Sequence, residues 1–275
     1  MKLIVLLCLL ITSSAQAWTQ RPPEQLSKCS VHAPYGLPIA NPKVDHICRQ
    51  AYLVGYDASA KLPRYTNYTL TPPNALGCIA RTNAFVADES IVNGAHPDDY
   101  VGTGYDKGHM VPDGDLSWDQ QVEYESFLMT NMAPQAGSLN RGIWKSLETS
   151  IRGWTVQSSQ PHTIYVGGIY NASNKKIGDG VVVPHAYYKI VINNQTKEFA
   201  AWLFPHIEPY PNLGNDLTRF RLPINQIQKL ANVQFKLPKN AKELNPRKEW
   251  DVDFGDLTKT KRAKCRASVE RIELP

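Results

Sequence analysis

The chain of 275 residues lacks several features that would each define a class of protein. No apolar run approaches the roughly 18 residues of a membrane-spanning helix, since the amino-terminal one covers only positions 3–11. The absence of a C-x-x-C pair and of closely spaced histidines argues against a zinc site. Charged residues amount to only 20% and hydrophobic residues to 42%, which excludes disorder, collagen and coiled coil and leaves a folded domain with a sizeable core.

The excess of positive charge is small. Lys plus Arg number 30 against 25 Asp plus Glu, so the formal net charge is +5 and the isoelectric point about 8.8. This balance is compatible with a polyanionic substrate and does not by itself indicate one.

The amino terminus is typical of a secretory signal peptide, residues 1–17. Lys2 precedes the apolar run, and small residues end in Ala15-Gln16-Ala17, an A-x-A cleavage site before Trp18. We therefore expect a secreted or periplasmic protein whose mature chain, residues 18–275, is a single domain with a proline-rich, irregular start up to residue 50. A retained anchor is the alternative, and the apolar run is short for one.

The cysteines of the mature chain are even in number, as in exported proteins with disulfide bonds. They are Cys29, Cys48, Cys78 and Cys265. Two disulfides are expected, and three pairings are open. We favour Cys29 with Cys48 and Cys78 with Cys265, because the second bond would tie the carboxyl-terminal tail to the body.

The hydrophobic pattern mixes strands and helices without regular alternation, which indicates an α+β fold. We expect a mixed, mainly antiparallel sheet core flanked by helices. The predicted strands cover residues 51–56, 65–70, 163–169, 181–183, 187–192 and 198–204, with Pro63 bounding the first pair as a hairpin. The predicted helices cover residues 119–129, 139–154 and 224–231.

The predicted helix 139–154 carries two stripes. Apolar residues recur every fourth position from Leu139 to Ile151, and a polar stripe beside them holds Asn140, Glu148 and Arg152. An ordinary surface ion pair between Glu148 and Arg152 is one interpretation of this polar stripe. A functional site is the other.

A glycine-rich segment, residues 100–113, precedes this helix and predicts an exposed, strained loop. His109 lies in it, directly after Asp106, Lys107 and Gly108. A histidine framed by a carboxylate and a cation is a candidate general base, and activity is expected to fall as pH drops through its titration range, about 6.5 if unperturbed.

At several separate blocks the chain resembles the DNA/RNA non-specific endonucleases, secreted nucleases of the ββα-metal class. Asp106-Lys107-Gly108-His109 looks like the DRGH signature of that family. Further blocks agree in order and spacing, and the similarity covers roughly residues 52–235: Pro63-Arg64-Tyr65, residues 130–135, Asn140-Arg141-Gly142-Ile143-Trp144, Leu147-Glu148, residues 165–170 and residues 222–227.

The resemblance implies a ββα-metal site that hydrolyses phosphodiester bonds in DNA and RNA. His109 then corresponds to the general base that activates water, Asn140 to the direct ligand of a Mg²⁺ ion, for which Mn²⁺ or another divalent ion could substitute, and Glu148 to a carboxylate acting through metal-bound water. The remaining correspondences are Arg64 and Arg152 as cations that stabilise the phosphate, Asp106 and Lys107 as parts of the signature, and Asn131 and Gln135 as supporting polar residues.

One residue departs from the family pattern, because Lys107 stands where arginine is usual. Lysine supplies a point charge without the bidentate fork, so phosphate contact at this position is expected to be weaker. No base-reading element is evident, so binding through the phosphate backbone should depend on salt and ignore base sequence.

Two other functions remain compatible with the sequence. The same machinery would serve a metal-dependent phosphodiesterase acting on small nucleotides. A catalytically idle nucleic-acid-binding protein on the same fold is the second, although His109, Asn140 and Glu148 are all present.

Overall fold

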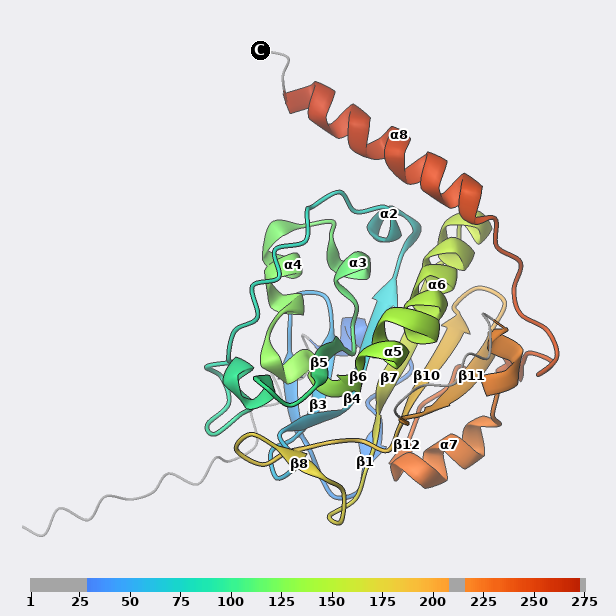
Figure 1. The fold of residues 1–275 in the computed structure, drawn as a ribbon. Helices are drawn as coiled ribbons and strands as arrows, with labels where there is room; N and C mark the ends of the chain where they lie inside the picture. Colours follow the sequence, from blue (N-terminus) through green and yellow to red (C-terminus); the bar gives the residue numbers. More distant parts are fainter. Residues whose placement is uncertain (1–28, 208–215, 273–275) are drawn as a thin grey trace, which may run out of the picture.

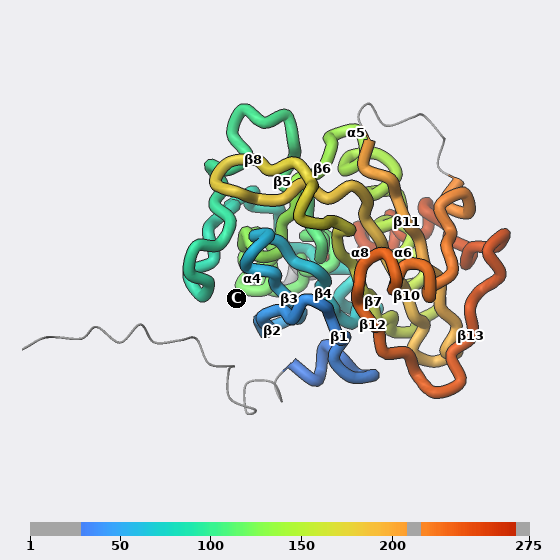
Figure 2. Tube along the Cα trace, turned by 90° about the horizontal axis from the view of Figure 1, so that it is seen from below, coloured from blue at the N-terminus to red at the C-terminus, as the bar shows by residue number. Residues whose placement is uncertain are grey.

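A mainly antiparallel sheet is the centre of the protein, seen here in a computed structural model that describes residues 29–207 and 216–272. Its strand order is β13-β11-β10-β7-β4-β3-β2, which Figure 2 shows from one edge to the other. Every neighbouring pair is antiparallel except β11 with β13. The strands are β2 (Asp45–Cys48), β3 (Leu53–Asp57), β4 (Leu62–Leu70), β7 (His162–Ile169), β10 (Ala186–Asn193), β11 (Glu198–Pro205) and β13 (Lys242–Glu243).

Three two-stranded sheets and a set of helices surround this sheet (Figure 1). The small sheets pair β1 (Ile39–Ala40) with β12 (Val233–Gln234), β5 (Tyr105–His109) with β6 (Met132–Ala136), and β8 (Lys176–Ile177) with β9 (Val181–Val182). The α-helices are α2 (Pro72–Ala75), α3 (Asp113–Leu116), α4 (Gln120–Ser126), α5 (Gly137–Leu139), α6 (Lys145–Ser158), α7 (Ile224–Ala231) and α8 (Phe254–Ile272). Short helical turns are η1 (Ser30–His32), η2 (Pro97–Tyr100), η3 (Met129–Asn131), the π-helical η4 (Asn140–Trp144) and η5 (Leu217–Phe220).

The sheet buries both faces because side chains alternate along each strand. In β10, Tyr187 and Val191 point into the core beneath α6, whereas Tyr188 and Ile190 point into the second core beneath α7. Lys189 has the parity of Tyr187, so this one charged residue of the strand lies on the α6 face. The α6 face therefore carries a buried cation.

The predicted α+β architecture is confirmed. The strands predicted at residues 51–56, 65–70, 163–169, 181–183, 187–192 and 198–204 correspond to β3, β4, β7, β9, β10 and β11, and β3 pairs with β4 as a hairpin. Two details differ. Pro63 lies inside β4, next to a β-bulge where Gly55 pairs with Tyr65 and Tyr56 with Pro63. The segment expected to be irregular up to residue 50 contributes β2 to the main sheet.

The helices agree in part with the prediction. α7 covers residues 224–231, and α4 begins after Asp119, whose carboxylate accepts hydrogen bonds from the backbone N–H of Gln121 and Val122. The helix predicted at 139–154 is confirmed by α6 from residue 145 onward, but it is not a single helix, since α5 and η4 precede α6 and Gly142 breaks the helical path with φ −99° and ψ −119°. α8 was not predicted, because its sequence is too polar to show an apolar period.

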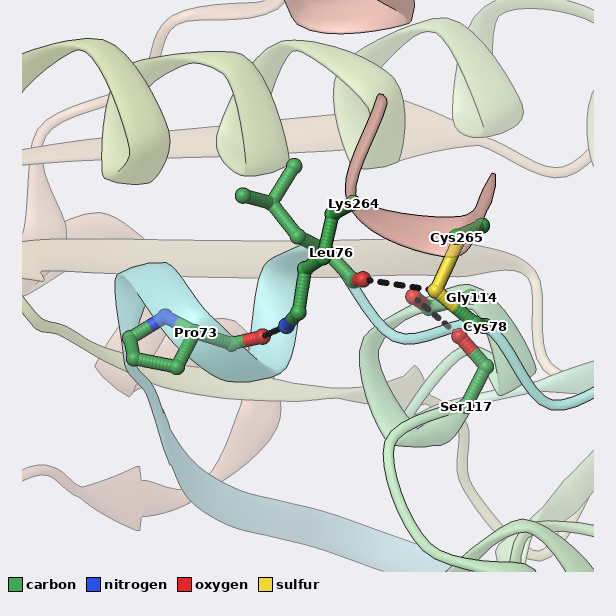
Figure 3. The surroundings of a disulfide bond; sticks show 7 residues. All are labelled: Pro73, Leu76, Cys78, Gly114, Ser117, Lys264 and Cys265. Carbon is green, nitrogen blue, oxygen red and sulfur yellow. Dashed lines mark hydrogen bonds between the residues drawn. A yellow bond between two sulfur atoms is a disulfide. The ribbon is translucent and has the colours of Figure 1, made fainter. Parts of the chain in front are cut away.

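Both expected disulfides are present. Cys29 is bonded to Cys48 and Cys78 to Cys265, with Cα atoms 5.4 Å apart in each pair. The second bond fixes α8 to the segment after α2, and beside it the Lys264 ammonium donates to the Pro73 carbonyl at 2.7 Å (Figure 3). The favoured pairing is thus confirmed, and the tail is tied to the body.

Two further expectations concern absences. Among the described residues, no helix combines the length and apolar character needed to cross a membrane. Within the same part of the chain, no group of three or more His, Cys, Asp and Glu side chains gathers as a metal cluster. The expected signal peptide at residues 1–17 lies outside the described residues.

Candidate active site

The candidate site is built on a β-β-helix unit made of β5, β6 and the helical segment that follows. The two strands pair antiparallel, with Asp106 opposite Gln135 and His109 opposite Met132. The exposed loop predicted around His109 is therefore wrong, because those residues form a paired strand whose last residue is buried. Its glycines hid the strand, and its partner strand contains Pro134, a residue unfavourable in strands.

Asn131 and Gln135 are buried within this unit, one through hydrogen bonds and the other through close packing. The Asn131 amide donates to the carbonyls of Val111 and Ser126, and its oxygen accepts from the Val111 backbone N–H, all at 2.9 Å. Gln135 is fully buried and crosses Gly108, where any Cβ would collide with its amide group. Glycine at position 108 is thus required by the close approach of Gln135.

His109 lies at the end of β5 with only 8% of its surface exposed. Its ring packs edge-on against Phe127, with centroids 5.0 Å apart, and Nε2 is buried without a hydrogen-bond partner among the described atoms. Burial, followed by the positive charges of Arg81 and Lys189, lowers the pKa of His109 to about 3. The imidazole is therefore neutral at pH 7 and has a lone pair able to accept a proton.

Asp106 orients Asn140. The Asn140 amide nitrogen donates to Asp106 Oδ2 at 2.9 Å, and Arg141 Nη1 donates to Oδ1 of the same carboxylate at 2.8 Å. Because the nitrogen of the Asn140 carboxamide is engaged, its carbonyl oxygen is the atom available to a cation. The π-helical turn η4, in which Asn140 and Arg141 both lie, brings them to this carboxylate.

Glu148 pairs with a buried lysine. Lys189 is fully buried in β10, and its ammonium donates to Glu148 Oε1 at 2.9 Å while lying 4.4 Å from the centre of the Trp144 ring. Burial raises the pKa of Glu148, while Lys189 and then Arg152 oppose that shift. The charge of Lys189 also helps to lower the pKa of His109, so the same lysine interacts electrostatically with both Glu148 and the histidine.

Arg152 has a different partner. Its Nη1 donates to Asp115 Oδ1 at 2.8 Å, and the other Asp115 oxygen accepts from the Tyr68 hydroxyl at 2.7 Å. Asp115 is only 1% exposed. The interpretation of Glu148 and Arg152 as an exposed ion pair does not describe the structure, because Glu148 pairs with the buried Lys189 and Arg152 with the buried Asp115.

Two cations flank His109. The Lys107 ammonium lies 5.3 Å from the centre of the Phe85 ring and 5.8 Å from that of Tyr100, and no carboxylate in the described ranges pairs with it. Arg81 lies over the Phe127 ring at 4.9 Å and donates to Asp113 at 3.3 Å. Both side chains are thus held by aromatic rings near the histidine.

Arg64 is not brought together with these residues. It lies at the β-bulge of β4, donates to Asp57 Oδ2 at 2.7 Å and stacks 4.3 Å from the centre of the Tyr170 ring. It lines a cavity of about 780 Å³ with residues such as Asp57 and Lys229. None of the contacts described for Arg64 reaches His109, Asn140 or Glu148.

The sequence as a whole matches a known family. The model of the DNA/RNA non-specific endonuclease family covers residues 32–242, which include every residue of the site just described. The chain belongs to this family. It is therefore a nuclease, an enzyme that hydrolyses phosphodiester bonds, and nucleic acids are its class of partner.

Curated relatives of this nuclease include proteins from yeast, mouse and a cyanobacterium. It is 29% identical over 238 residues to "Nuclease 1, mitochondrial" of Schizosaccharomyces pombe, covering 76% of this chain and 72% of that one. It is 25% identical over 233 residues to "Nuclease EXOG, mitochondrial" of Mus musculus (78% and 62%) and 26% over 255 residues to a nuclease of Nostoc (84% and 90%). The nuclease thus spans less than two thirds of the mouse relative.

A solved structure supports the fold of the nuclease. EndoG, determined in complex with EndoGI, matches with a TM-score of 0.66 and 24% identity over 76% of this chain and 91% of that one. The expected α+β fold with a ββα-metal motif is confirmed by this likeness.

Sequence reasoning missed several residues of the nuclease site. Lys189 carried a signal, because a lysine within an apolar strand requires a buried partner. Arg81 and Asp113 carried no such signal, because they lie in or beside irregular segments whose conformation cannot be predicted from a local sequence pattern.

Proposed function

We propose that this chain is a secreted, Mg²⁺-dependent endonuclease that hydrolyses phosphodiester bonds in DNA and RNA without regard to base sequence. The observation that carries the proposal is the neutral imidazole of His109, whose buried Nε2 has no hydrogen-bond partner among the described atoms, on the strand that also carries Asp106, the residue that orients Asn140. A proton acceptor and an oriented oxygen donor are the two groups that metal-assisted hydrolysis requires from the protein.

The donor set fits a hydrated magnesium ion. Nucleases of this family depend on a divalent metal, and Mg²⁺ prefers oxygen ligands and keeps most of its waters. The carbonyl oxygen of Asn140 would hold the ion, and Glu148, whose Oε1 accepts from Lys189, would accept hydrogen bonds from its waters through the other oxygen. When bound, the ion supplies positive charge for the phosphate and the leaving oxygen. Mn²⁺ is expected to substitute.

His109 acts as the general base. Its neutral ring accepts a proton from the attacking water as the water oxygen bonds to phosphorus and the bond to the leaving oxygen breaks. Burial and the neighbouring charges of Arg81 and Lys189 keep this ring unprotonated before the reaction. The histidine is therefore unprotonated over the whole physiological pH range.

Cations around the histidine stabilise the phosphate. Lys107 and Arg81 flank His109, and Arg152 stands on the same helix as Glu148. Arg81, rather than Arg64, would then act as a phosphate-binding cation beside His109. Such contacts act on the backbone of the polynucleotide, which supports cleavage without base preference.

Secretion is proposed from the sequence and the disulfides. The leading segment has the composition of a signal peptide, and both cysteine pairs of the remaining chain are bonded. The printed names of the fission yeast and mouse relatives state a mitochondrial location for those proteins.

Digestion of supercoiled plasmid and of ribosomal RNA, with and without EDTA, tests the proposal. We expect both substrates to be cut with Mg²⁺ and neither with EDTA, and His109→Ala to lower kcat by about 10²–10⁴ at unchanged substrate affinity. Turnover of bis-p-nitrophenyl phosphate without plasmid cleavage would instead identify a small-nucleotide phosphodiesterase. Intact nucleic acid after prolonged incubation with Mg²⁺ or Mn²⁺ would refute the proposal.

A further inference from the structure

The positive charge of the chain is concentrated in α8. The helix holds six basic and two acidic residues, a net charge of +4 in a chain whose formal net charge is +5. The other residues are therefore almost neutral as a set. A helix of this kind needs an explanation, because like charges on one helix repel each other.

The helix is fixed to the body at two places. At its beginning, Gln157 of α6 exchanges hydrogen bonds with the backbone of Asp253, at 2.6 and 2.9 Å. Near its middle, the disulfide between Cys265 and Cys78 holds it beside α2 (Figure 3). α8 therefore has a defined position, and Figure 1 shows it crossing above α2 and the end of α6.

This position adjoins the active site. The side chain of Leu257 is buried in contact with Gly153, one residue after Arg152, and Gly153 leaves room for Val252 just before the helix. One turn later on the same face, Lys261 is half-buried, and its pKa is lowered by burial and then by the charge of Arg152, against the influence of Asp115 and Asp113. The packed face of α8 thus reaches the residues that surround Glu148 and Arg81.

A second face of α8 is basic and exposed. Lys259, Arg262 and Arg266 are all exposed and follow one another at steps of three and four residues, which places them in one stripe. The stripe rises about 10 Å along the helix. Duplex DNA carries one phosphate charge per about 1.7 Å of axis, so about six phosphates lie within that length.

We propose that α8 is a phosphate-binding arm that holds a nucleic acid duplex outside the catalytic centre. The stripe of Lys259, Arg262 and Arg266 lies on the side of the helix opposite Leu257 and Lys261, so it contacts phosphates of the duplex away from the cleaved bond. This inference rests on the proposed function for the nature of the substrate. Complementary charge and covalent fixation next to the site identify the occupant as the nucleic acid backbone.

The test compares two triple variants with equal loss of charge. The arm variant is Lys259→Gln, Arg262→Gln and Arg266→Gln, and the control is Lys229→Gln, Lys239→Gln and Lys242→Gln, three exposed lysines of α7 and the segment after it. Fluorescence anisotropy with a labelled 30-base-pair DNA duplex gives Kd between 50 and 200 mM KCl, measured in the His109→Ala background to prevent cleavage. Hydrolysis of bis-p-nitrophenyl phosphate is measured with His109 intact.

We expect the arm variant to raise Kd by about tenfold or more and to reduce the slope of log Kd against log salt by about 2 to 3, the share of three phosphate contacts. Hydrolysis of the small substrate should stay within twofold of wild type, and the control variant should bind duplex nearly as wild type does. An unchanged slope in the arm variant, or equal weakening in both variants, overturns the proposal.

Two further outcomes are distinguishable. If the arm variant loses binding to phosphatidylserine vesicles and keeps its affinity for the duplex, the arm serves a membrane surface and the proposal is overturned. If the wild-type protein fails to cut plasmid, the proposed function fails, while the duplex Kd still decides whether α8 binds nucleic acid.

Discussion

The protonation of His109 gives the sharpest quantitative prediction. An ordinary histidine, with a pKa of about 6.5, is neutral in roughly 3% of molecules at pH 5, whereas a pKa of about 3 leaves about 99% neutral. A base with the ordinary pKa would therefore lose about 25-fold in its active form between pH 7 and pH 5, and the buried His109 almost none. The fall of activity near pH 6.5 was expected for an unperturbed histidine, and with the lowered pKa of His109 we expect that fall at a lower pH.

The same shift affects stability, with a definite sign. The unfolded state binds a proton at this histidine below pH 6.5 and the folded state does not. The free energy of unfolding therefore decreases as pH falls from 6.5 toward 3. Between pH 7 and pH 5 the loss is about 2 kcal/mol. His109→Gln should be spared this loss. His162, whose pKa burial lowers to about 4, is a matched case outside the site, and His162→Gln should behave similarly with activity retained.

The assay is a titration of the imidazole by NMR in metal-free protein, with urea unfolding at pH 7 and pH 5 for the wild type and both variants. A His109 signal that titrates near pH 6.5, or equal loss of stability in the wild type and His109→Gln, would refute the reasoning.

Three other changes have definite outcomes. Lys189→Met leaves the Glu148 carboxylate buried without its partner, so we expect the free energy of unfolding, measured with urea, to fall by about 3–5 kcal/mol. Addition of Glu148→Gln should largely restore that stability without restoring activity. A Lys189→Met variant as stable as wild type would show that the pair is not buried. Lys107→Arg restores the usual family residue and should leave plasmid cleavage equal or slightly faster, and a tenfold loss would contradict its role beside His109. Mass spectrometry without reductant should find no free thiol, and Cys29→Ala with Cys48→Ala should lower the free energy of unfolding by about 2–5 kcal/mol at unchanged kcat. Two alkylatable cysteines in active protein would contradict the presence of two disulfides.

The sheet was predictable because its strands carry long apolar runs. β10 and β11 are almost entirely buried, and such segments follow from residue type alone. α8 and β5 were not predictable in this way. The stability of α8 comes from a disulfide and from contacts with α6, while β5 depends on a partner strand more than twenty residues later in the sequence.

The site was predictable only as a set of residue types. The resemblance drew attention to His109, Asn140 and Glu148, but it could not show that Lys189 holds Glu148 or that Asp106 orients Asn140. Arg64 illustrates the limit, because a bulge in β4 turns it toward Asp57 while Arg81, from an irregular segment, lies beside the histidine. Long-range pairing of charges decided these positions, and local sequence does not encode it.

The central claim, that Asn140 binds the metal directly and Glu148 acts through its waters, is tested most directly by kcat as a function of Mg²⁺ concentration on one plasmid at fixed salt. Asn140→Ala should nearly abolish turnover and raise the metal requirement. Glu148→Gln should lower kcat by about 10–100-fold. Lys145→Ala, an exposed change on the same helix, should leave both quantities unchanged. Wild-type turnover and metal dependence in both Asn140→Ala and Glu148→Gln would contradict the assignment of the site.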